Sequence, residues 1–156
     1  MNKITVQELN SILSNLNAEI QNVIHRTAFG EYEDWSGIRD FENITDPNEL
    51  QLLDEYKTVM QKLTYINSAI TYMNRPVIQE STLFLNAQGN YEDEYHIYHC
   101  GDSIEFYFYD EWNEKYKWRE SRIEHNGERY YIVGNPNVEL NGLSVRYRKS
   151  RQTGGF

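Results

Sequence analysis

The sequence contains one cysteine, Cys100, among its 156 residues, which excludes a disulfide bond within the chain. It has no apolar run approaching the roughly 18 residues that a membrane-spanning helix needs. Residues 1–10 are polar and helical in character, so we expect no signal peptide. Internal repeats and low-complexity segments are also missing. Together these absences predict a protein of the cytoplasm.

Basic residues are scarce: the net charge is −9, and residues 1–80 hold 12 acidic side chains against 6 basic ones. Such a chain is repelled by phosphate backbones unless it has a local basic patch, and it should be attracted to basic surfaces. The hydrophobic content of 39% and the aromatic content of 14% are too high for a disordered protein. The length allows one good core or two small ones.

The sequence also lacks a convincing catalytic or metal-binding set. The nearest candidates are His96, His99 and Cys100, but a zinc site requires four ligands in closed geometry. A cysteine nucleophile needs a base, an orienting group and an oxyanion site, and nothing nearby supplies them. No glycine-rich phosphate loop opens a helix. We therefore expect no enzyme activity, no catalytic residues, no metal and no cofactor.

The first structural element that the sequence predicts is a helix over residues 6–29. Thr5 and Glu8 have the spacing of a capping box, and Gly30 is suited to end the helix. Apolar residues follow at spacings of three and four, which is a narrow stripe of coiled-coil type. The stripe consists of Val6, Leu9, Leu13, Leu16, Ile20 and Val23.

A second helix is predicted after Asp46, which serves as N-cap, with Pro47 in the first helical position. Asn74 and Pro76 end it. Its apolar stripe again has spacings of four and three. The stripe consists of Leu52, Tyr56, Val59, Leu63, Ile66, Ile70 and Met73.

Neither stripe can be buried by one helix alone, so residues 1–75 are predicted to form an antiparallel helical hairpin. A homodimer through this hairpin would complete a helical bundle. The residues that we expect to be buried between the two helices are Leu16, Ile20, Leu63 and Ile66.

The connection between the helices, residues 30–45, is long, since 2–8 residues are usual. It mixes acidic and aromatic side chains. One interpretation is that its aromatics fold back onto the hairpin. The other is a docking loop for a basic protein surface, with Trp35 and Phe41 as buried anchors in a charged rim. Its candidate binding residues are Tyr32, Glu33, Asp34, Trp35, Asp40 and Phe41.

From residue 76 the composition changes to tyrosine, glycine and β-branched residues. Ile104, Phe106 and Phe108 alternate with polar or tyrosine residues, which is the period of a half-buried strand. Asn126-Gly127 predicts a tight hairpin in which Glu124 faces Arg129 and Ile123 faces Tyr130. Short strands over about 70 residues indicate a small antiparallel SH3-like β-barrel at residues 76–150, with 151–156 as a loose tail. The predicted class is thus α+β.

The segments GDSIEFYF (101–108), RIEHNGERYYIVG (122–134) and LNGLSVRYR (140–148) carry a resemblance. Over roughly residues 75–148 the chain resembles a domain-of-unknown-function family found in small proteins of Gram-positive bacteria and their mobile elements. The resemblance implies a small β-barrel and a phage, plasmid or transposon setting. The family has no established activity, so no catalytic residues can be carried over from it.

A second candidate surface lies around the predicted strand at residues 103–109. If Ile104, Phe106 and Phe108 face the core, the tyrosines between them face outward. These aromatics could stack on the bases of single-stranded nucleic acid, anchor a protein partner, or be covered by the helical hairpin. The candidate residues are Tyr107, Tyr109, Trp112, Tyr116, Trp118 and Arg119.

The function that we expect is a non-enzymatic protein-interaction module. In its sharpest form this is a phage or mobile-element inhibitor that binds a basic surface of a host nucleic-acid-handling complex, as anti-CRISPR proteins do. The alternative is a nucleic-acid-binding protein that uses the aromatic and basic face of the barrel, although weak binding is expected at a net charge of −9.

Overall fold

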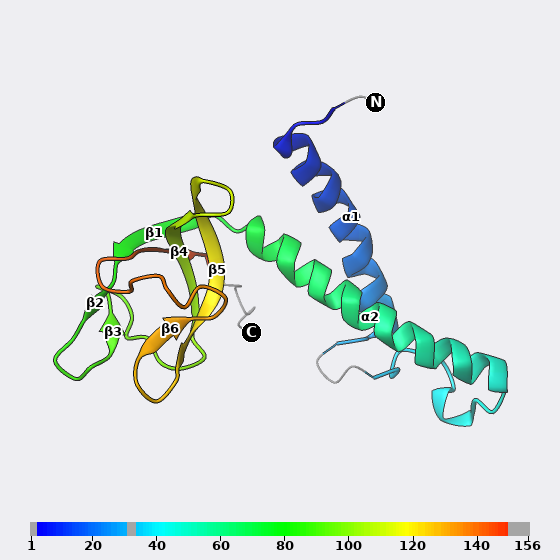
Figure 1. Cartoon of the computed structure of the whole chain (residues 1–156). Coiled ribbons are helices and arrows are strands. Elements are labelled where there is room, and N and C mark those ends of the chain that lie inside the picture. The colour runs from blue at the N-terminus through cyan, green and yellow to red at the C-terminus, as the bar shows by residue number, and fades with distance from the viewer. Residues whose placement is uncertain (1–2, 31–33, 150–156) are drawn as a thin grey trace. The chain divides into compact units, whose positions relative to one another are not determined.

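A computed structural model of the protein describes residues 3–30 and 34–149. The chain divides into two compact units, a helical unit (Met1–Arg75) and a sheet unit (Pro76–Phe156) (Figure 1). Two N-terminal helices followed by an antiparallel sheet confirm the α+β class. In the described ranges no helix combines the length and the apolar character needed to cross a membrane. The predicted loose tail, residues 151–156, lies outside the described residues.

Helix α1 (Val6–Thr27) begins at the predicted capping box. The Thr5 hydroxyl accepts a hydrogen bond from the Glu8 backbone N–H at 3.1 Å, and the Glu8 carboxylate accepts one from the Thr5 N–H at 2.7 Å. The helix ends earlier than expected, because the residue that caps it in the left-handed conformation, with φ 50°, is Ala28 and not Gly30. The capping box is confirmed, and the predicted C-cap is wrong by two residues.

Helix α2 (Pro47–Met73) begins and ends as predicted. The Asp46 carboxylate accepts hydrogen bonds from the backbone N–H groups of Asn48 and Glu49 at 2.7 and 3.3 Å. At the other end the Asn74 N–H donates to the Ile70 carbonyl at 3.1 Å. Between the helices lies a short 3-10 helix, η1 (Phe41–Asn43).

The two helices pair in antiparallel fashion, as expected, and α1 crosses α2 in Figure 1. Two polar contacts fix the register. The Asn10 amide donates to Asn74 Oδ1 at 3.0 Å, and the Asn17 amide donates to Thr71 Oγ1 at 3.1 Å.

The packing between the helices differs from the expectation. Ile20 is buried and Leu63 is half-buried, but Leu16 and Ile66 are exposed. The reason is that Asn17, which follows Leu16 on the helix surface, occupies the position facing α2 and is itself buried. Each helix is thereby rotated so that part of its apolar stripe points away from the other helix.

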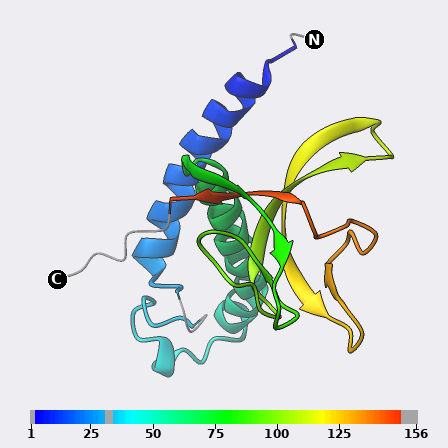
Figure 2. The ribbon, with the colours of Figure 1, turned by 90° about the vertical axis from the view of Figure 1, so that its left-hand side faces the viewer.

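The sheet unit contains a five-stranded antiparallel sheet in the order β1-β7-β4-β5-β6 and a separate two-stranded pair, β2-β3. Strands β1 and β6 each pair with one neighbour only, so the sheet formed by the described strands is open and the SH3-like barrel is not confirmed. Figure 2 shows how strongly the β4–β5 ribbon curls. The strands are β1 (Val77–Thr82), β2 (Phe84–Leu85), β3 (Tyr91–Glu92), β4 (Ser103–Asp110), β5 (Lys115–His125), β6 (Tyr130–Ile132) and β7 (Ser144–Arg148).

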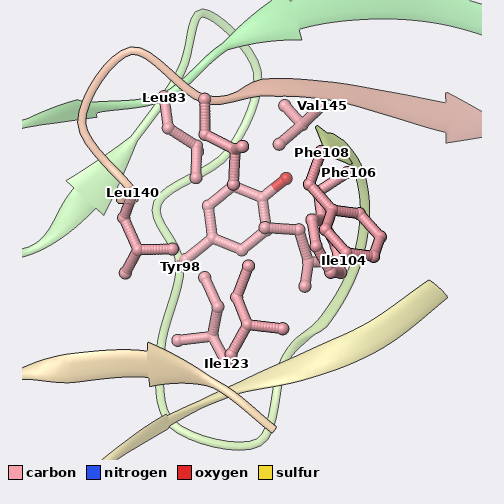
Figure 3. Packing of buried hydrophobic residues seen from close by; sticks show 10 residues of the cluster. Leu83, Tyr98, Ile104, Phe106, Phe108, Ile123, Leu140 and Val145 are labelled. Atoms are coloured by element: carbon pink, nitrogen blue, oxygen red, sulfur yellow. The ribbon is translucent and has the colours of Figure 1, made fainter. Parts of the chain in front are cut away.

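The core of the sheet unit lies on one face of this sheet. Ile104, Phe106 and Phe108 are buried, which confirms the alternation that the sequence predicted. The ring of Tyr98 occupies the middle of the cluster, a role that we had not predicted (Figure 3). The other buried members are Leu83, Ile123, Ile132, Leu140, Leu143 and Val145.

The β5–β6 hairpin has a different register from the predicted one. Ile123 pairs with Ile132 instead of Tyr130, and Glu124 pairs with Tyr131 instead of Arg129. The Asn126 side chain accepts hydrogen bonds from the N–H groups of Glu128 and Arg129, both at 3.0 Å. This turn lengthens the loop to four residues, 126–129, and so shifts every pair after it.

A buried polar network ties β7 to the segment after β3. Asp93 is 7% exposed and accepts hydrogen bonds from the N–H groups of Tyr95 and His96 at 2.8 and 3.0 Å. The Tyr147 hydroxyl also donates to Asp93, and it lies 2.5 Å from the Tyr98 hydroxyl. Burial raises the pKa of Tyr98 to about 12 and raises that of Tyr147 as well. Both hydroxyls therefore keep their protons at neutral pH.

We expect Asp93→Ala to lower the free energy of unfolding of the sheet unit by about 1–3 kcal/mol, because it removes the acceptor of three hydrogen bonds. Urea unfolding of the full chain measures the loss. The control is Glu94→Ala, which changes the next, exposed carboxylate. Equal midpoints for the two variants would show that the network adds no stability.

Candidate functional site

The face of the sheet opposite the core carries a group of aromatic side chains from β4 and β5. Tyr107 and Tyr109 alternate with the buried residues of β4 and therefore point to the other side of the sheet. In the register of the two strands, Tyr107 pairs with Trp118 and Tyr109 pairs with Tyr116. We call these four side chains the aromatic face.

The four rings contact one another in one continuous series. The Tyr109 and Tyr116 centroids are 5.1 Å apart, and Tyr116 stacks on Tyr107 at 5.4 Å with an interplanar angle of 20°. Tyr107 in turn lies 5.2 Å from Trp118. Aromatic pairs at these distances stabilise one another beyond their buried area. The three tyrosines are nevertheless exposed, with Tyr116 at 64% and Tyr107 at 40%, and Trp118 is half-buried.

An arginine continues the series onto β7. The guanidinium carbon of Arg146 lies 4.3 Å from the centre of the Trp118 ring, which is a cation–π contact. Arg146 also donates two hydrogen bonds to Glu105 Oε1, at 2.8 and 2.6 Å. Arg148 donates to both oxygens of Glu105 at 2.9 Å. Glu105 is buried, so this triad fixes the position of Arg146 against Trp118.

The charges next to the aromatic face are largely paired. Arg122, on the same face of β5, forms an ion pair with Glu124 at 2.9 Å. Glu120 lies directly opposite Glu105 in the strand register. Its pKa is raised, mainly by burial and also by the negative charge of Glu105.

The β4–β5 ribbon extends beyond the rest of the sheet, because β7 pairs with β4 only at Glu105 and Phe106. Trp112 lies in the turn at its tip and is 92% exposed. Hydrogen bonds from Lys117 and Asn113 lower the pKa of Asp110 to about 2, so the carboxylate at this end of the ribbon stays ionised at neutral pH. A hollow of about 470 Å³ lies beside the tip. Its lining includes Phe108, Tyr109, Trp112, Pro136 and Val138.

Apart from Arg122, the basic residues of β5 lie on the side of the sheet opposite the aromatic face. Lys115, Lys117 and Arg119 alternate with Tyr116 and Trp118, and therefore point to the opposite side. Lys117 Nζ lies 5.8 Å from the centre of the Phe108 ring, on the core side of β4. The interleaved aromatic and basic surface that the nucleic-acid alternative requires is therefore divided between two faces.

The predicted binding residues of the inter-helix loop differ in their exposure. Tyr32 and Glu33 lie outside the described residues. Asp34 and Asp40 are exposed, and Phe41 is 40% exposed. Trp35 is only 8% exposed and is a core residue of the helical unit, so its side chain does not lie on the surface as the docking interpretation requires.

Trp35 packs in the small core where the loop folds back onto the helices. Its ring lies 5.2 Å from that of Phe29, and both rings join the buried Met60. Gly37 passes so close to α1 that an added Cβ would lie 2.1 Å from the Thr27 carbonyl oxygen. Of the two interpretations of the loop, folding back therefore describes Trp35. A binding role for Asp34, Asp40 and Phe41 stays a prediction.

The histidines and the cysteine form ordinary polar contacts. His96 Nε2 lies 3.0 Å from Asp102 Oδ2, and the N–H of His99 donates to the same oxygen at 2.7 Å. The latter bond is the main reason that the pKa of Asp102 is lowered. The Cys100 thiol donates to Glu124 at 2.6 Å. Across residues 3–30 and 34–149, no three His, Cys, Asp or Glu side chains are grouped to hold a metal ion.

Three residues of the site were not predicted as such: Glu105, Arg146 and Arg148. The outward position of Glu105 between core residues was the available signal. Its pairing with a strand about 40 residues later was not visible in the sequence.

Comparisons with known proteins bear on the sheet unit only. No curated protein and no solved structure matches the chain significantly. One family model matches, over residues 81–147, which include the whole aromatic face and none of the described helices. The resemblance to a family without known activity is confirmed to that extent. The sheet unit is thus similar to the family described as a domain of unknown function (DUF5348).

Proposed function

We propose that this protein is a protein-interaction module that binds its partner through the aromatic face. One observation carries the proposal: three exposed tyrosines and the half-buried Trp118 are held in a single fixed series, and Arg146 anchors one end of it. Exposed tyrosine and tryptophan at such density call for an explanation, because they are the residues that dominate binding energy at interfaces.

The fixed geometry favours binding. A side chain that is already held in place loses little conformational entropy when a partner covers it. Arg146 is held by Glu105 and Trp118, so its position is set before any partner arrives. Because Arg146, Arg148 and Arg122 already contact carboxylates, covering this face with a protein leaves few charges without a partner.

The pairing of these charges also favours a protein over nucleic acid. Affinity for nucleic acid comes largely from cations that contact phosphates. On the aromatic face the arginines form ion pairs with Glu105 and Glu124, and the lysines of β5 point to the opposite side. Bases could stack on the rings, but their phosphates would find mainly paired arginines beside them.

Several narrower expectations belong to this proposal. The net charge of −9 supports a partner with a basic surface. A host nucleic-acid-handling complex would offer such a surface, so an anti-CRISPR-like inhibitor from a phage or mobile element of Gram-positive bacteria is the narrower form. The cytoplasm is the compartment in which it would act.

Tyr116→Ala tests the proposal. A tagged full chain captures its partner from a host lysate in the presence and absence of nuclease, and the affinity of the purified pair is then measured. We expect Tyr116→Ala to weaken binding about 30-fold, which is a typical hot-spot effect. The matched control is Arg119→Ala, on the opposite face of the same strand, and it should leave the affinity unchanged.

Two outcomes would contradict the proposal. Unchanged affinity for Tyr116→Ala would place the binding surface elsewhere. A partner that disappears on nuclease treatment, together with weaker binding by Arg119→Ala, would support the nucleic-acid alternative instead.

A further inference from the structure

The apolar stripes of α1 and α2 are wider than the contact between the two helices. Only Ile20 and Met60 of the apolar side chains within the helices are fully buried. Thirteen other large hydrophobic side chains of the helices are exposed, and we call nine of these the apolar helical face. They are Leu9, Ile12, Leu16 and Val23 on α1, and Leu52, Tyr56, Val59, Ile66 and Met73 on α2.

On α1, the exposed apolar side chains come one position before the residues that face α2. Leu9, Leu16 and Val23 recur every seven residues, and each comes one position before Asn10, Asn17 or Ile24. Asn10 and Asn17 face α2, because their side chains donate hydrogen bonds to it. One position corresponds to about 100° around a helix. The exposed stripe of α1 is therefore rotated by roughly a quarter turn from the contact with α2.

The same offset occurs on α2. Leu52, Val59 and Ile66 come one position before Leu53, Met60 and Asn67, which are half-buried or buried. Because the helices are antiparallel, an equal rotation about each axis brings the two stripes to the same side of the hairpin. The two stripes thus form one face of the hairpin, whereas Leu50 and Tyr65 of α2, which are also exposed, lie outside it.

A groove between the helices belongs to this face. It has a volume of about 290 Å³ and lies where the start of α1 meets the end of α2. All but one of its lining side chains are apolar: Val6, Leu9, Leu13, Ala69, Ile70 and Met73, together with Asn10.

The area of the apolar helical face is large for a monomer. With roughly 60–80 Å² left on each half-exposed side chain, nine side chains expose on the order of 600 Å². The largest apolar patch on a typical monomer is about 300–600 Å². A stable interface buries about 800 Å² on each partner, its polar rim included. The face therefore has the size of an interface core.

We propose that a second copy of this chain covers the apolar helical face, so that two hairpins form an antiparallel four-helix bundle. A stripe with a seven-residue repeat fits best against another helix with the same repeat. Within residues 3–30 and 34–149 the only further helix is η1, of three residues, so the helices that match these stripes belong to another molecule. A two-fold dimer supplies an identical face, and this is the commonest assembly of identical chains.

This inference is independent of the proposed function. It rests on the helical unit, whereas the aromatic face lies in the sheet unit. A dimer would present two aromatic faces to a partner and would raise the apparent affinity if both could bind at once. Tyr116→Ala should therefore leave the mass of the assembly unchanged.

The test is the mass of the full chain in solution, measured by sedimentation equilibrium over a range of concentrations. A reductant is present because the exposed Cys100 could otherwise crosslink two chains. We expect about 37 kDa, twice the chain mass of 18.6 kDa. A mass of 18.6 kDa, that of a monomer, at about 100 μM would overturn the proposal.

A pair of charge substitutions locates the interface. Leu16→Asp with Val59→Asp should raise the dimer dissociation constant about 100-fold or more, because each places an unpaired charge in an apolar interface. The control is Ser11→Asp with Ser68→Asp, which adds the same charge one position after Asn10 and Asn67, on the opposite side of the hairpin. Helix content by circular dichroism shows whether the variants fold. A folded Leu16→Asp, Val59→Asp variant that dimerises like its control would overturn the proposal.

Discussion

Replacing Glu105 with alanine should lower the stability of the sheet unit by about 3–5 kcal/mol, which is the cost of breaking a buried ion pair by removing one partner. Glu105 is 5% exposed and accepts hydrogen bonds from both Arg146 and Arg148. Without its carboxylate, two arginines remain close together and largely buried. Amide hydrogen exchange of β4 and β7, measured on the full chain, reports the loss. Protection within about 1 kcal/mol of the unchanged protein would contradict this role.

The control for this change is Glu120→Gln, which alters the carboxylate directly opposite. The pKa of Glu120 is raised in the folded protein, so its ionisation opposes folding, and its favourable contribution is lost as the pH rises through that pKa. Glu120→Gln should therefore stabilise the protein slightly at neutral pH, and the gain should vanish in acid. A loss of stability for Glu105→Ala together with a gain for Glu120→Gln would show that the surroundings of each carboxylate decide its effect on stability.

Trp35→Ala should destabilise the helical unit by about 3–5 kcal/mol, as is typical of a buried tryptophan. The unit has a small core in which Trp35 packs with Phe29 and Met60, so few other contacts could compensate. The helical signal at 222 nm, followed during thermal unfolding, measures the change. A loss of partner binding with unchanged stability would contradict a core role for Trp35 and would support the docking interpretation.

Phe41→Ala is the matched control for Trp35, because it removes a large aromatic side chain from the same loop. Phe41 is exposed, so its replacement should change the stability by no more than about 0.5 kcal/mol. Weaker partner binding by this variant would support the remaining part of the docking-loop hypothesis. Unfolding by this variant would contradict the placement of Phe41 on the surface.

The helices could be predicted because their signals are local. Thr5 with Glu8 and Asp46 with Pro47 mark starts that depend only on nearby backbone groups. The seven-residue spacing indicates which side of each helix is apolar. It does not say how much of that side the other helix covers. Leu16 was expected to be buried for this reason, yet the polar contact of Asn17 with Thr71 rotates it outward.

The sheet was harder to predict because pairing between distant strands leaves little trace in the sequence. The alternation of β4 located the core, but the contact of Glu105 with β7 depends on strand order. One turn residue also changed the outcome, since the Asn126 side chain lengthens the loop and shifts the register of β5 and β6.

The division of β5 into two faces was predictable and was missed. Lys115, Tyr116, Lys117, Trp118 and Arg119 alternate strictly, and alternate residues of a strand lie on opposite faces. We had instead grouped Tyr116, Trp118 and Arg119 on one candidate surface. The structure begins β5 at Lys115.

Photo-crosslinking from the aromatic face tests the central claim most directly. A benzophenone amino acid replaces either Tyr116 or Lys117, which are adjacent in β5 and point to opposite faces. After irradiation in host lysate, crosslinked proteins are identified by mass spectrometry. We predict that position 116 captures one partner protein that position 117 does not. Capture of the same protein from position 117 alone, or equally from both, would contradict a partner bound on the aromatic face.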